Sequence, residues 1–308
     1  QGSNEIIPLE PSDRWLLSLP LYHVGGLGIL FRCVLAGATV VIPQADEEIL
    51  TSITRHGITH LSLVATQLFR LLQNSESMKQ NTLKAMLVGG GPLPGNLIDK
   101  ALELGWPIYA TYGMTEMASQ VATKRLERSG SGKIIPCARV LNYRELKLSS
   151  DGEILVKGKT LFKGYVDGAK ISLPLQADGW FATGDLGVWQ EHDCLSVTGR
   201  KDNMFISGGE NIYPEEIEQL LQRLEDVQAA VVVAVNDAEF GLRPVAVMKV
   251  DPGFDLSLTK KYLEENLPRF KVPDVFYLWP EMHKPSGLKV SRKQLAELVR
   301  NGRLTKFS

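Results

Sequence analysis

The sequence predicts an α/β protein, and three observations along its 308 residues predict that class. Short apolar runs alternate with longer segments of helical spacing over residues 5–128, which is typical of βαβ units. Short, turn-bounded runs fill residues 129–198 and are typical of antiparallel strands. Helices and strands mix again over residues 203–308. We therefore expect a partial large N-terminal domain of mostly parallel sheet with helices and a small β-barrel-like subdomain, followed by a small α+β C-terminal domain.

The elements of the first segment are predicted from apolar runs separated by Gly and Pro. Strands are expected at residues 15–19, 39–42, 61–64, 85–88 and 107–110, and helices at 67–73 and 93–104. We expect residues 1–4 (Gln-Gly-Ser-Asn) to be a leftover of cloning that takes no part in the fold.

The later elements follow from the same signals. Strands are expected at 143–148, 153–156, 188–190, 195–198, 227–235 and 243–250, and helices at 258–267 and 292–299. Pro214 suits the first position of a further helix, and acidic residues follow it at the favourable end of the helix dipole. Residues 199–202 are the candidate boundary, either an interdomain hinge or an ordinary loop.

Composition excludes several classes of protein. Lys and Arg number 34 against 35 Asp and Glu, so no basic excess favours nucleic acid or an anionic membrane as a partner. No apolar run approaches the roughly 20 residues of a membrane-spanning helix. A cytoplasmic protein is the expectation, and a homo-oligomer is neither favoured nor excluded.

Two metal or redox interpretations fail at the level of sequence. Cys33, Cys137 and Cys194 are odd in number and far apart, so we expect packing residues rather than disulfides or a metal pair. His56 and His60 stand four apart, but Gly57 is expected to end the helix between them, which disfavours zinc.

Two polar segments follow predicted strands, where ligands bind in α/β sheets. The run Gly89, Gly90, Gly91 and Pro92 either lets a flat ligand approach the backbone or makes a tight turn. In residues 112–116 an aromatic ring can stack on a base, a hydroxyl can hold a phosphate and an acid can hold Mg²⁺. The alternative for this second segment is a helix start capped by Thr115.

Three further segments have the same double interpretation. Asp185, after a Gly-containing turn, suits a ribose diol or is a surface carboxylate. Residues 207–214 form a Gly-rich loop before a helix. Lys289 lies in another Gly-containing loop, where a lysine is either solvated or reaches a phosphate as a point charge.

Six segments occur in a specific order: 20–23, 112–116, 152–154, 179–185, 199–218 and 287–289. In order and approximate spacing they resemble the adenylate-forming superfamily of acyl-CoA synthetases, aryl-CoA ligases and peptide-synthetase adenylation domains. The resemblance runs from about residue 15 to residue 299. It is closest to the o-succinylbenzoate–CoA ligases of menaquinone biosynthesis, in residues 112–119, 202–218, 239–247 and 287–292.

This resemblance implies an ATP-dependent acid–CoA ligase that works through an acyl-adenylate, with Mg²⁺ as cofactor and coenzyme A and a small carboxylic acid as partners. Lys289 would bridge the carboxylate and the α-phosphate. Thr115 would hold a phosphate oxygen, and Glu116 would bind Mg²⁺. His23 would shield or orient the acid, although a core histidine is the alternative.

The nucleotide and coenzyme A sites are implied in the same way. Asp185, helped by Arg200, would grip the ribose, and Asp202 would be the hinge of a rotating C-terminal domain. Adenine would lie between two segments: Gly89, Gly90, Gly91 and Pro92, and Tyr112, Gly113 and Met114. The pantetheine tunnel would be lined by Ser207, Gly208 and Gly209. The acyl pocket would lie between residues 23–26, 64–67, Gly89 and Ser119.

One departure from the family matters. The family's phosphate loop lies well upstream of the segment at residues 20–23, and nothing before Pro20 resembles it. The run at residues 129–133 fails a Walker-type pattern because Glu127 stands where the first Gly belongs and Ile134 where Ser or Thr belongs. We therefore expect a fragment that binds ATP poorly and adenylates slowly.

Rival functions stay open at this level. Another aryl- or acyl-CoA synthetase is the main enzymatic alternative, and a peptide-synthetase adenylation domain is disfavoured because no carrier domain follows. A non-catalytic nucleotide-binding fragment is the alternative from a different class.

Overall fold

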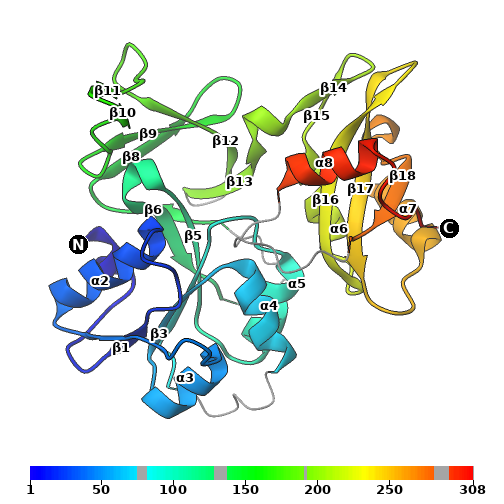
Figure 1. Cartoon of the computed structure of the whole chain (residues 1–308). Coiled ribbons are helices and arrows are strands. Elements are labelled where there is room, and N and C mark those ends of the chain that lie inside the picture. The colour runs from blue at the N-terminus through cyan, green and yellow to red at the C-terminus, as the bar shows by residue number, and fades with distance from the viewer. Residues whose placement is uncertain (75–81, 128–136, 191–192, 281–290, 308) are drawn as a thin grey trace. The chain divides into compact units, whose positions relative to one another are not determined.

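The computed structural model describes residues 1–74, 82–127, 137–190, 193–280 and 291–307 (Figure 1). The chain forms two compact units. Unit 1 comprises Gln1–Thr183 and Gly187–Val197, and unit 2 comprises Gly184–Leu186 and Thr198–Ser308. The predicted fold class is confirmed in both: a mostly parallel sheet with helices and an antiparallel subdomain in unit 1, and an α+β arrangement in unit 2.

A seven-stranded sheet is the centre of the described part of unit 1, in the order β2-β1-β3-β4-β5-β6-β7. The first five strands run parallel, and β6 and β7 are antiparallel to their neighbours. The strands are β1 (Arg14–Leu16), β2 (Thr39–Val41), β3 (His60–Leu63), β4 (Ala85–Val88), β5 (Ile108–Met114), β6 (Ser119–Arg125) and β7 (Arg139–Val140). The helices are α1 (Gly2–Ile6), α2 (Val24–Ala36), α3 (Ile49–His56), α4 (Ala65–Gln73), α5 (Gly95–Glu103) and the 3₁₀ turn η2 (Thr115–Met117).

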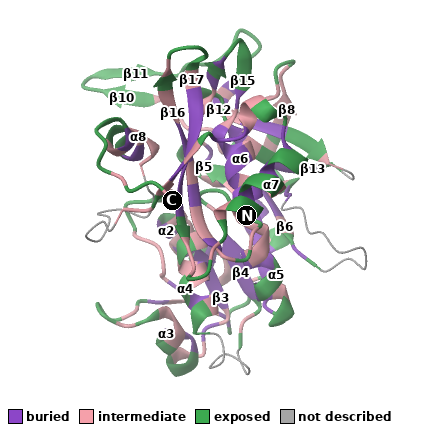
Figure 2. Ribbon diagram, turned by 90° about the vertical axis from the view of Figure 1, so that its right-hand side faces the viewer, coloured by how far each residue is buried: buried purple, intermediate pink, exposed green. Residues whose placement is uncertain are grey.

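Successive side chains of a strand point to opposite faces of this sheet, so a separate hydrophobic core forms on each face. In β4, Met86 and Val88 join the core formed with α3, α4 and α5. The intervening Ala85 and Leu87 join a second core with α2 and with Ile7, which directly follows α1, on the opposite face. The strands are accordingly buried and the outward helix surfaces exposed (Figure 2).

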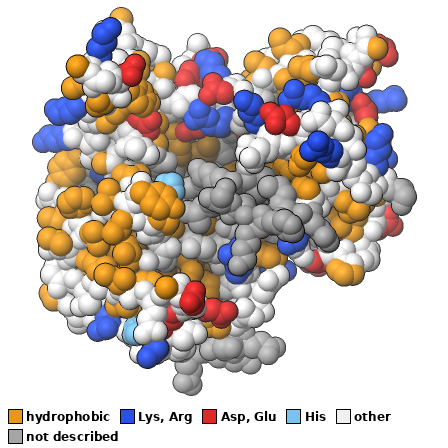
Figure 3. All heavy atoms as spheres, viewed as in Figure 1, with side chains coloured by type: hydrophobic (Ala, Val, Ile, Leu, Met, Phe, Trp, Pro, Cys, Tyr) orange, Lys and Arg blue, Asp and Glu red, His pale blue; other side chains and the backbone are white. Residues whose placement is uncertain are grey.

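Helix α2 was not predicted, because its first turns contain three glycines. Gly26 is the one that the packing requires. A Cβ on Gly26 would lie 2.3 Å from the carbonyl oxygen of Pro20, so a glycine lets the helix approach the preceding segment closely. The outer side of α2 carries exposed Phe31, Val34 and Leu35, and hydrophobic side chains gather on that face in Figure 3.

A curled four-stranded antiparallel sheet in the order β13-β12-β9-β8 is the second part of unit 1, except that residues 184–186 of β12 and 198–200 of β13 belong to unit 2. Its strands are β8 (Arg144–Leu148), β9 (Glu153–Gly158), β12 (Phe181–Gln190) and β13 (Cys194–Arg200), and an exposed hairpin, β10 (Tyr165–Asp167) with β11 (Lys170–Ser172), lies between β9 and β12 in the sequence. A core that includes Met117, Val121 and Phe181 joins this sheet to η2 and β6.

Two expectations about unit 1 are wrong. Cys137 and Cys194 form a disulfide, with their Cα atoms 5.4 Å apart, while Cys33 is free and buried. The pairing of Ala138 with Leu195 brings the two cysteines together across 57 residues, which sequence proximity does not reveal. The N-terminal residues are not an appendage either: Gly2 and Ser3 are buried in α1, and a Cβ on Gly2 would lie 2.7 Å from the carbonyl of Asn142.

Unit 2 is built on the three-stranded sheet β16-β17-β18. Residues of α6 and α7 cover one face, and Leu295 and Val299 of α8 cover the other. The elements are η3 (Lys201–Asn203), β14 (Phe205–Ser207), β15 (Glu210–Ile212), α6 (Pro214–Leu221), β16 (Val227–Asp237), β17 (Gly241–Val250), α7 (Leu256–Asn266), η4 (Arg269–Lys271), β18 (Val275–Leu278) and α8 (Arg292–Arg300). Pro214 is the first residue of α6, as predicted. None of the helices described in either unit is long and apolar enough to cross a membrane.

Candidate functional site

Two predicted binding segments of unit 1 lie side by side at the carboxyl ends of parallel strands. Val88 of β4 pairs with Ala110 of β5, so the glycine turn and the end of β5 are neighbours. A Cβ on Gly89 would lie 2.5 Å from Cγ2 of Thr111, and Gly90 has a left-handed φ of +82°. The turn therefore needs glycine for close approach and for its backbone conformation.

The second segment is held by an unusual backbone between β5 and β6. A Cβ on Gly113 would lie 2.0 Å from the carbonyl oxygen of Ser119. Ala118 and Ser119 have φ values of +52° and +89°, a conformation costly for residues with side chains and common at functional sites. Met117 is buried in the core below and anchors η2.

The geometry presents Thr115 and Glu116 outward from this anchored turn. Thr115 is exposed and Glu116 is half-buried. The residue that caps η2 is Met114 and not Thr115, so the capping interpretation of Thr115 is wrong. Oε1 of Glu116 accepts a hydrogen bond of 2.8 Å from the Tyr165 hydroxyl of β10. Partial burial and the neighbouring Glu116 carboxylate raise the pKa of Tyr165, so the phenol stays protonated at neutral pH.

Mg²⁺ fits this site only together with other ligands. A carboxylate oxygen of the Glu116 kind is what Mg²⁺ prefers. Within the described ranges no group of three or more His, Cys, Asp or Glu could hold a metal. Magnesium commonly completes its shell with substrate phosphates and water, which a single carboxylate next to a nucleotide site allows.

His23 lies at the start of α2. It is the N-cap residue of that helix, is exposed, and has its ring centroid 4.6 Å from that of Tyr22. Its exposure excludes the core-histidine alternative. Nearby, Nε2 of Gln67 donates to the carbonyl of Ser18 at 3.1 Å, which ties the turn at residues 64–67 to the segment before His23.

Arg32 of α2 is the residue that sequence reasoning missed. It is 6% exposed, and its Nη1 has no hydrogen-bond partner among the residues that the structure describes. Burial, and secondly the charge of Arg144, lower the pKa of Arg32 to about 10. A Cβ on Gly28 would lie 3.4 Å from Nη2 of Arg32 and 3.8 Å from Oγ of Ser119, so the guanidinium borders the region expected to hold the acid. The signal was present: Arg32 is the one charged residue between positions 24 and 36.

Unit 2 brings together the residues expected at the ribose and at the hinge. Nη1 of Arg200 lies 2.9 Å from Oδ1 of Asp185, and its Nη2 lies 2.7 Å from Oδ2 of Asp202. A Cβ on Gly184 would lie 3.0 Å from Arg200. Asp185 itself is part of β12 and not of a turn, so the expected Gly-turn presentation is replaced by a strand with a left-handed glycine before it.

The predicted tunnel segment forms the turn between β14 and β15. Gly208 and Gly209 have left-handed φ values of +57° and +89°. The backbone N–H of Gly208 donates to the carbonyl of Phe240 at 2.9 Å, and Nη1 of Arg243 lies 3.5 Å from Oγ of the buried Ser207. The turn is therefore fixed by β17 and the loop that precedes it.

Lys289 lies outside the described residues. The helix that follows, α8, is anchored by Arg292, whose guanidinium contacts Glu215 and Glu218 of α6 and the carbonyl of Val232. Burial raises the pKa of Glu218, with Arg292 opposing that rise. Within each unit the predicted residues thus gather in groups: the glycine turn, Tyr112, Thr115 and Glu116 in one, and Asp185, Arg200 and Asp202 in the other.

Comparison with known proteins places this geometry in a family. The model of the AMP-binding enzyme family matches residues 2–166, and that of the AMP-binding enzyme C-terminal domain matches residues 216–287. A 2-succinylbenzoate–CoA ligase of Salmonella typhimurium is 40% identical over 302 residues, which cover 97% of this chain and 63% of that protein.

Solved structures agree with this result. A variant of the Escherichia coli protein MenE with bound OSB-AMS has a TM-score of 0.83 at 36% identity, covering 97% of this chain and 62% of that one. The o-succinylbenzoate CoA synthetase of Bacillus subtilis, in complex with ATP and magnesium ion, has a TM-score of 0.79 at 35% identity, covering 96% and 63%. The chain spans about 63% of the length of such relatives. By the match of more than half of its residues, the chain belongs to the AMP-binding enzyme family.

Proposed function

We propose that the chain serves an ATP-dependent acid–CoA ligase reaction that proceeds through an acyl-adenylate, with 2-succinylbenzoate as the acid. The relatives with this activity align along 97% of the chain. The observation that carries the proposal is the pair of neighbouring strand ends, where the glycine turn after β4 adjoins the turn that presents Thr115 and Glu116.

In the first half-reaction, the acid's carboxylate oxygen attacks the α-phosphorus of ATP and pyrophosphate leaves. The backbone at residues 89–92 and the ring of Tyr112 would hold adenine, and the Thr115 hydroxyl would donate to a phosphate oxygen. Mg²⁺, when bound, supplies charge neutralisation on the phosphates, and Glu116 would hold it. Lys289 would place its ammonium between the two reacting anions.

In the second half-reaction, the coenzyme A thiolate attacks the acyl carbon and AMP leaves, which gives the thioester. The Asp185 carboxylate would accept from the ribose hydroxyls, with Arg200 fixing its orientation. Asp202 would be the hinge, and the turn of Ser207, Gly208 and Gly209 would line the path of the pantetheine chain. Glycines in a left-handed turn leave room for a narrow, extended substrate.

Arg32 favours an acid that carries a second carboxylate. A buried cation without a counter-ion is costly, and a bound carboxylate would supply that counter-ion through a charge-assisted hydrogen bond. Simple benzoates and fatty acids lack such a group. The position of Arg32 beside Gly28 and Ser119 therefore supports succinylbenzoate over the other aryl- and acyl-CoA substrates.

The proposal is tested by acid-dependent ATP–pyrophosphate exchange and by mass spectrometry of thioester products. Both are measured on this chain and on a version extended to its relatives' full length. We expect exchange with 2-succinylbenzoate to exceed that with benzoate or a fatty acid, and Glu116→Gln to lower it while the exposed Glu145→Gln does not. Nucleotide binding without exchange in the extended version would favour the non-catalytic alternative. The slow rate expected of the 308-residue chain stays a prediction, and an equal rate in both versions would contradict it.

A further inference from the structure

The hydroxyl of Tyr165 links the exposed β10–β11 hairpin to the side chain of Glu116. The donor–acceptor distance is 2.8 Å. The same stretch of chain contacts η2 a second time, because the backbone N–H of Phe162 donates to the carbonyl of Glu116 at 2.7 Å. Both the backbone and the carboxylate of Glu116 are therefore held by residues 162–165.

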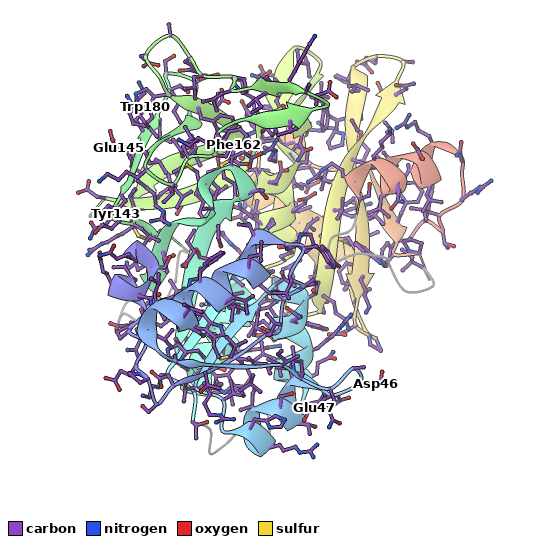
Figure 4. All side chains as sticks on the ribbon, turned by 60° about the vertical axis from the view of Figure 1, so that its left-hand side comes forward. Asp46, Glu47, Tyr143, Glu145, Phe162 and Trp180 are labelled. Carbon is purple, nitrogen blue, oxygen red and sulfur yellow. A yellow bond between two sulfur atoms is a disulfide. The ribbon has the colours of Figure 1, made fainter. Side chains whose placement is uncertain are left out.

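An aromatic ladder fixes this stretch in place. The Phe162 ring meets the Tyr165 ring edge to face at 4.7 Å and the Phe181 ring at 5.5 Å. Figure 4 labels Phe162 within the antiparallel part of unit 1. Phe181 belongs to the same buried core as Met117 of η2. The ring contacts through Phe162 therefore fix the position of Tyr165 relative to that core.

We propose that Tyr165 is a positioning residue that fixes the orientation of the Glu116 carboxylate toward a divalent cation bound with the nucleotide. The inference rests on the proposed role of Glu116. The terminal torsion of a glutamate is broad, so a free carboxylate samples many orientations. A hydrogen bond to Oε1 narrows that range and leaves Oε2 as the ligand, as partners of metal ligands commonly do.

The exposure of the hairpin around this hydroxyl argues against a purely structural role for it. Tyr165, Val166 and Ile171 are 46%, 73% and 68% exposed, so the hairpin brings little apolar surface into the core. Figure 2 shows both strands of the hairpin in the exposed colour. Removing one exposed hydroxyl should therefore change stability little, while the orientation of Glu116 should change much.

The test measures cation binding directly. Electron paramagnetic resonance counts bound Mn²⁺ in the presence of a non-hydrolysable ATP analogue, for the chain extended to its relatives' full length (the wild type here) and for its variants Tyr165→Phe, Glu116→Gln and Tyr143→Phe. Tyr165→Phe keeps the ring and removes only the donor. Tyr143 is the matched control, since it is 43% exposed in the same unit and contacts Lys159 rather than Glu116. We expect Tyr165→Phe to weaken Mn²⁺ binding about tenfold, with an unchanged melting temperature and unchanged nucleotide binding without metal.

The outcomes separate this inference from the proposed function. Mn²⁺ binding weakened by Glu116→Gln but not by Tyr165→Phe overturns the inference alone. Binding unaffected by Glu116→Gln, or no Mn²⁺ bound with nucleotide by the wild type, removes Glu116 as a ligand and overturns it too. Weakening by both variants and not by Tyr143→Phe supports it, even if acid-dependent exchange is absent and the proposed function fails.

Discussion

At the scale of single residues, Arg32 shows how a site can conflict with stability. Its pKa is lowered from the usual arginine range to about 10, chiefly by burial, so the folded state disfavours the charged form. A shift of this size is worth about 3 kcal/mol. Such a cost, with no carboxylate in the described ranges bonded to Nη1, is typical of a residue kept for binding rather than for folding.

We predict that Arg32→Met raises the free energy of unfolding at pH 7 by about 1–3 kcal/mol, since an apolar side chain replaces a buried cation that lies over the Trp15 ring at 5.3 Å and whose Nη1 has no hydrogen-bond partner among the described residues. Above pH 10, and up to the ordinary pKa of arginine, the unfolded wild-type chain binds more protons than the folded one, so wild-type stability rises with pH there. Denaturant titrations at pH 7 measure the first effect, with the exposed Arg55→Met as control. A dicarboxylate should raise the melting temperature of the wild type only. Destabilisation by Arg32→Met would contradict the prediction.

Arg292, unlike Arg32, is a cation that stabilises the fold, because its removal would leave two buried carboxylates without their counter-ion. Glu215 and Glu218 are both buried, and Arg292 contacts both. We predict that Arg292→Met lowers the free energy of unfolding by about 3–5 kcal/mol at pH 7. Burial already raises the folded-state pKa of Glu218 above 4.5. The stability that protonated Glu218 contributes is therefore lost as the pH rises from 4.5 through that folded-state pKa.

The loss caused by Arg292→Met should therefore be smaller at pH 5, where Glu218 more readily takes a proton. Chemical denaturation at the two pH values measures this difference. The neighbouring exposed Lys293→Met should stay within about 0.5 kcal/mol of the wild type. Equal losses at both pH values would show that Glu218 is not the stranded charge.

At the scale of elements, periodicity located most strands but misjudged where several end. The predicted strand at 107–110 extends to Met114, because β6 pairs with it through Ser119 and a bulge at Gly113. That pairing lies beyond what an apolar run can show. The predicted helix end at Gly57 is confirmed, since a left-handed glycine caps α3 directly after His56.

The residues of the candidate site, like the strands, could be predicted only in part. Residues on short, ordered motifs, such as Glu116 and Asp185, could be named from the sequence because type and spacing carry the signal. Tyr165 could not, because its significance depends on a contact across 49 residues. Arg32 is marked in the sequence only as the single charge between positions 24 and 36, and its significance depends on burial. The disulfide between Cys137 and Cys194 was not predicted for the same reason, because the two cysteines meet across 57 residues.

Helix α2 escaped prediction because its glycines are poor helix formers chosen for packing. We predict that Gly26→Ala destabilises unit 1 by more than 2 kcal/mol, since its Cβ would lie 2.3 Å from a backbone carbonyl that cannot move cheaply. Gly95→Ala is the matched control. It lies in the first turn of α5 with nothing within 4 Å of its Cβ, and should be neutral or stabilising by a few tenths of a kcal/mol. Thermal unfolding of both variants measures the contrast, and equal melting temperatures would contradict it.

At the scale of the whole molecule, each unit has cores of its own. The cores of unit 1 are built on the seven-stranded and four-stranded sheets, and those of unit 2 on the two faces of β16, β17 and β18. Units with separate cores can unfold separately, and the proposed hinge at Asp202 requires two such bodies.

We predict two calorimetric transitions for the chain, and the two variants above assign them. Gly26→Ala should lower the melting temperature of one transition, and Arg292→Met that of the other, because each substituted residue lies within one unit. A ligand held by residues of both units should bring the transitions together, whereas a ligand of one unit should raise only its own. The measurement is differential scanning calorimetry with and without AMP. A single transition shifted equally by both variants would mean that the units fold as one, and a hinge at Asp202 would then have no independent bodies to move.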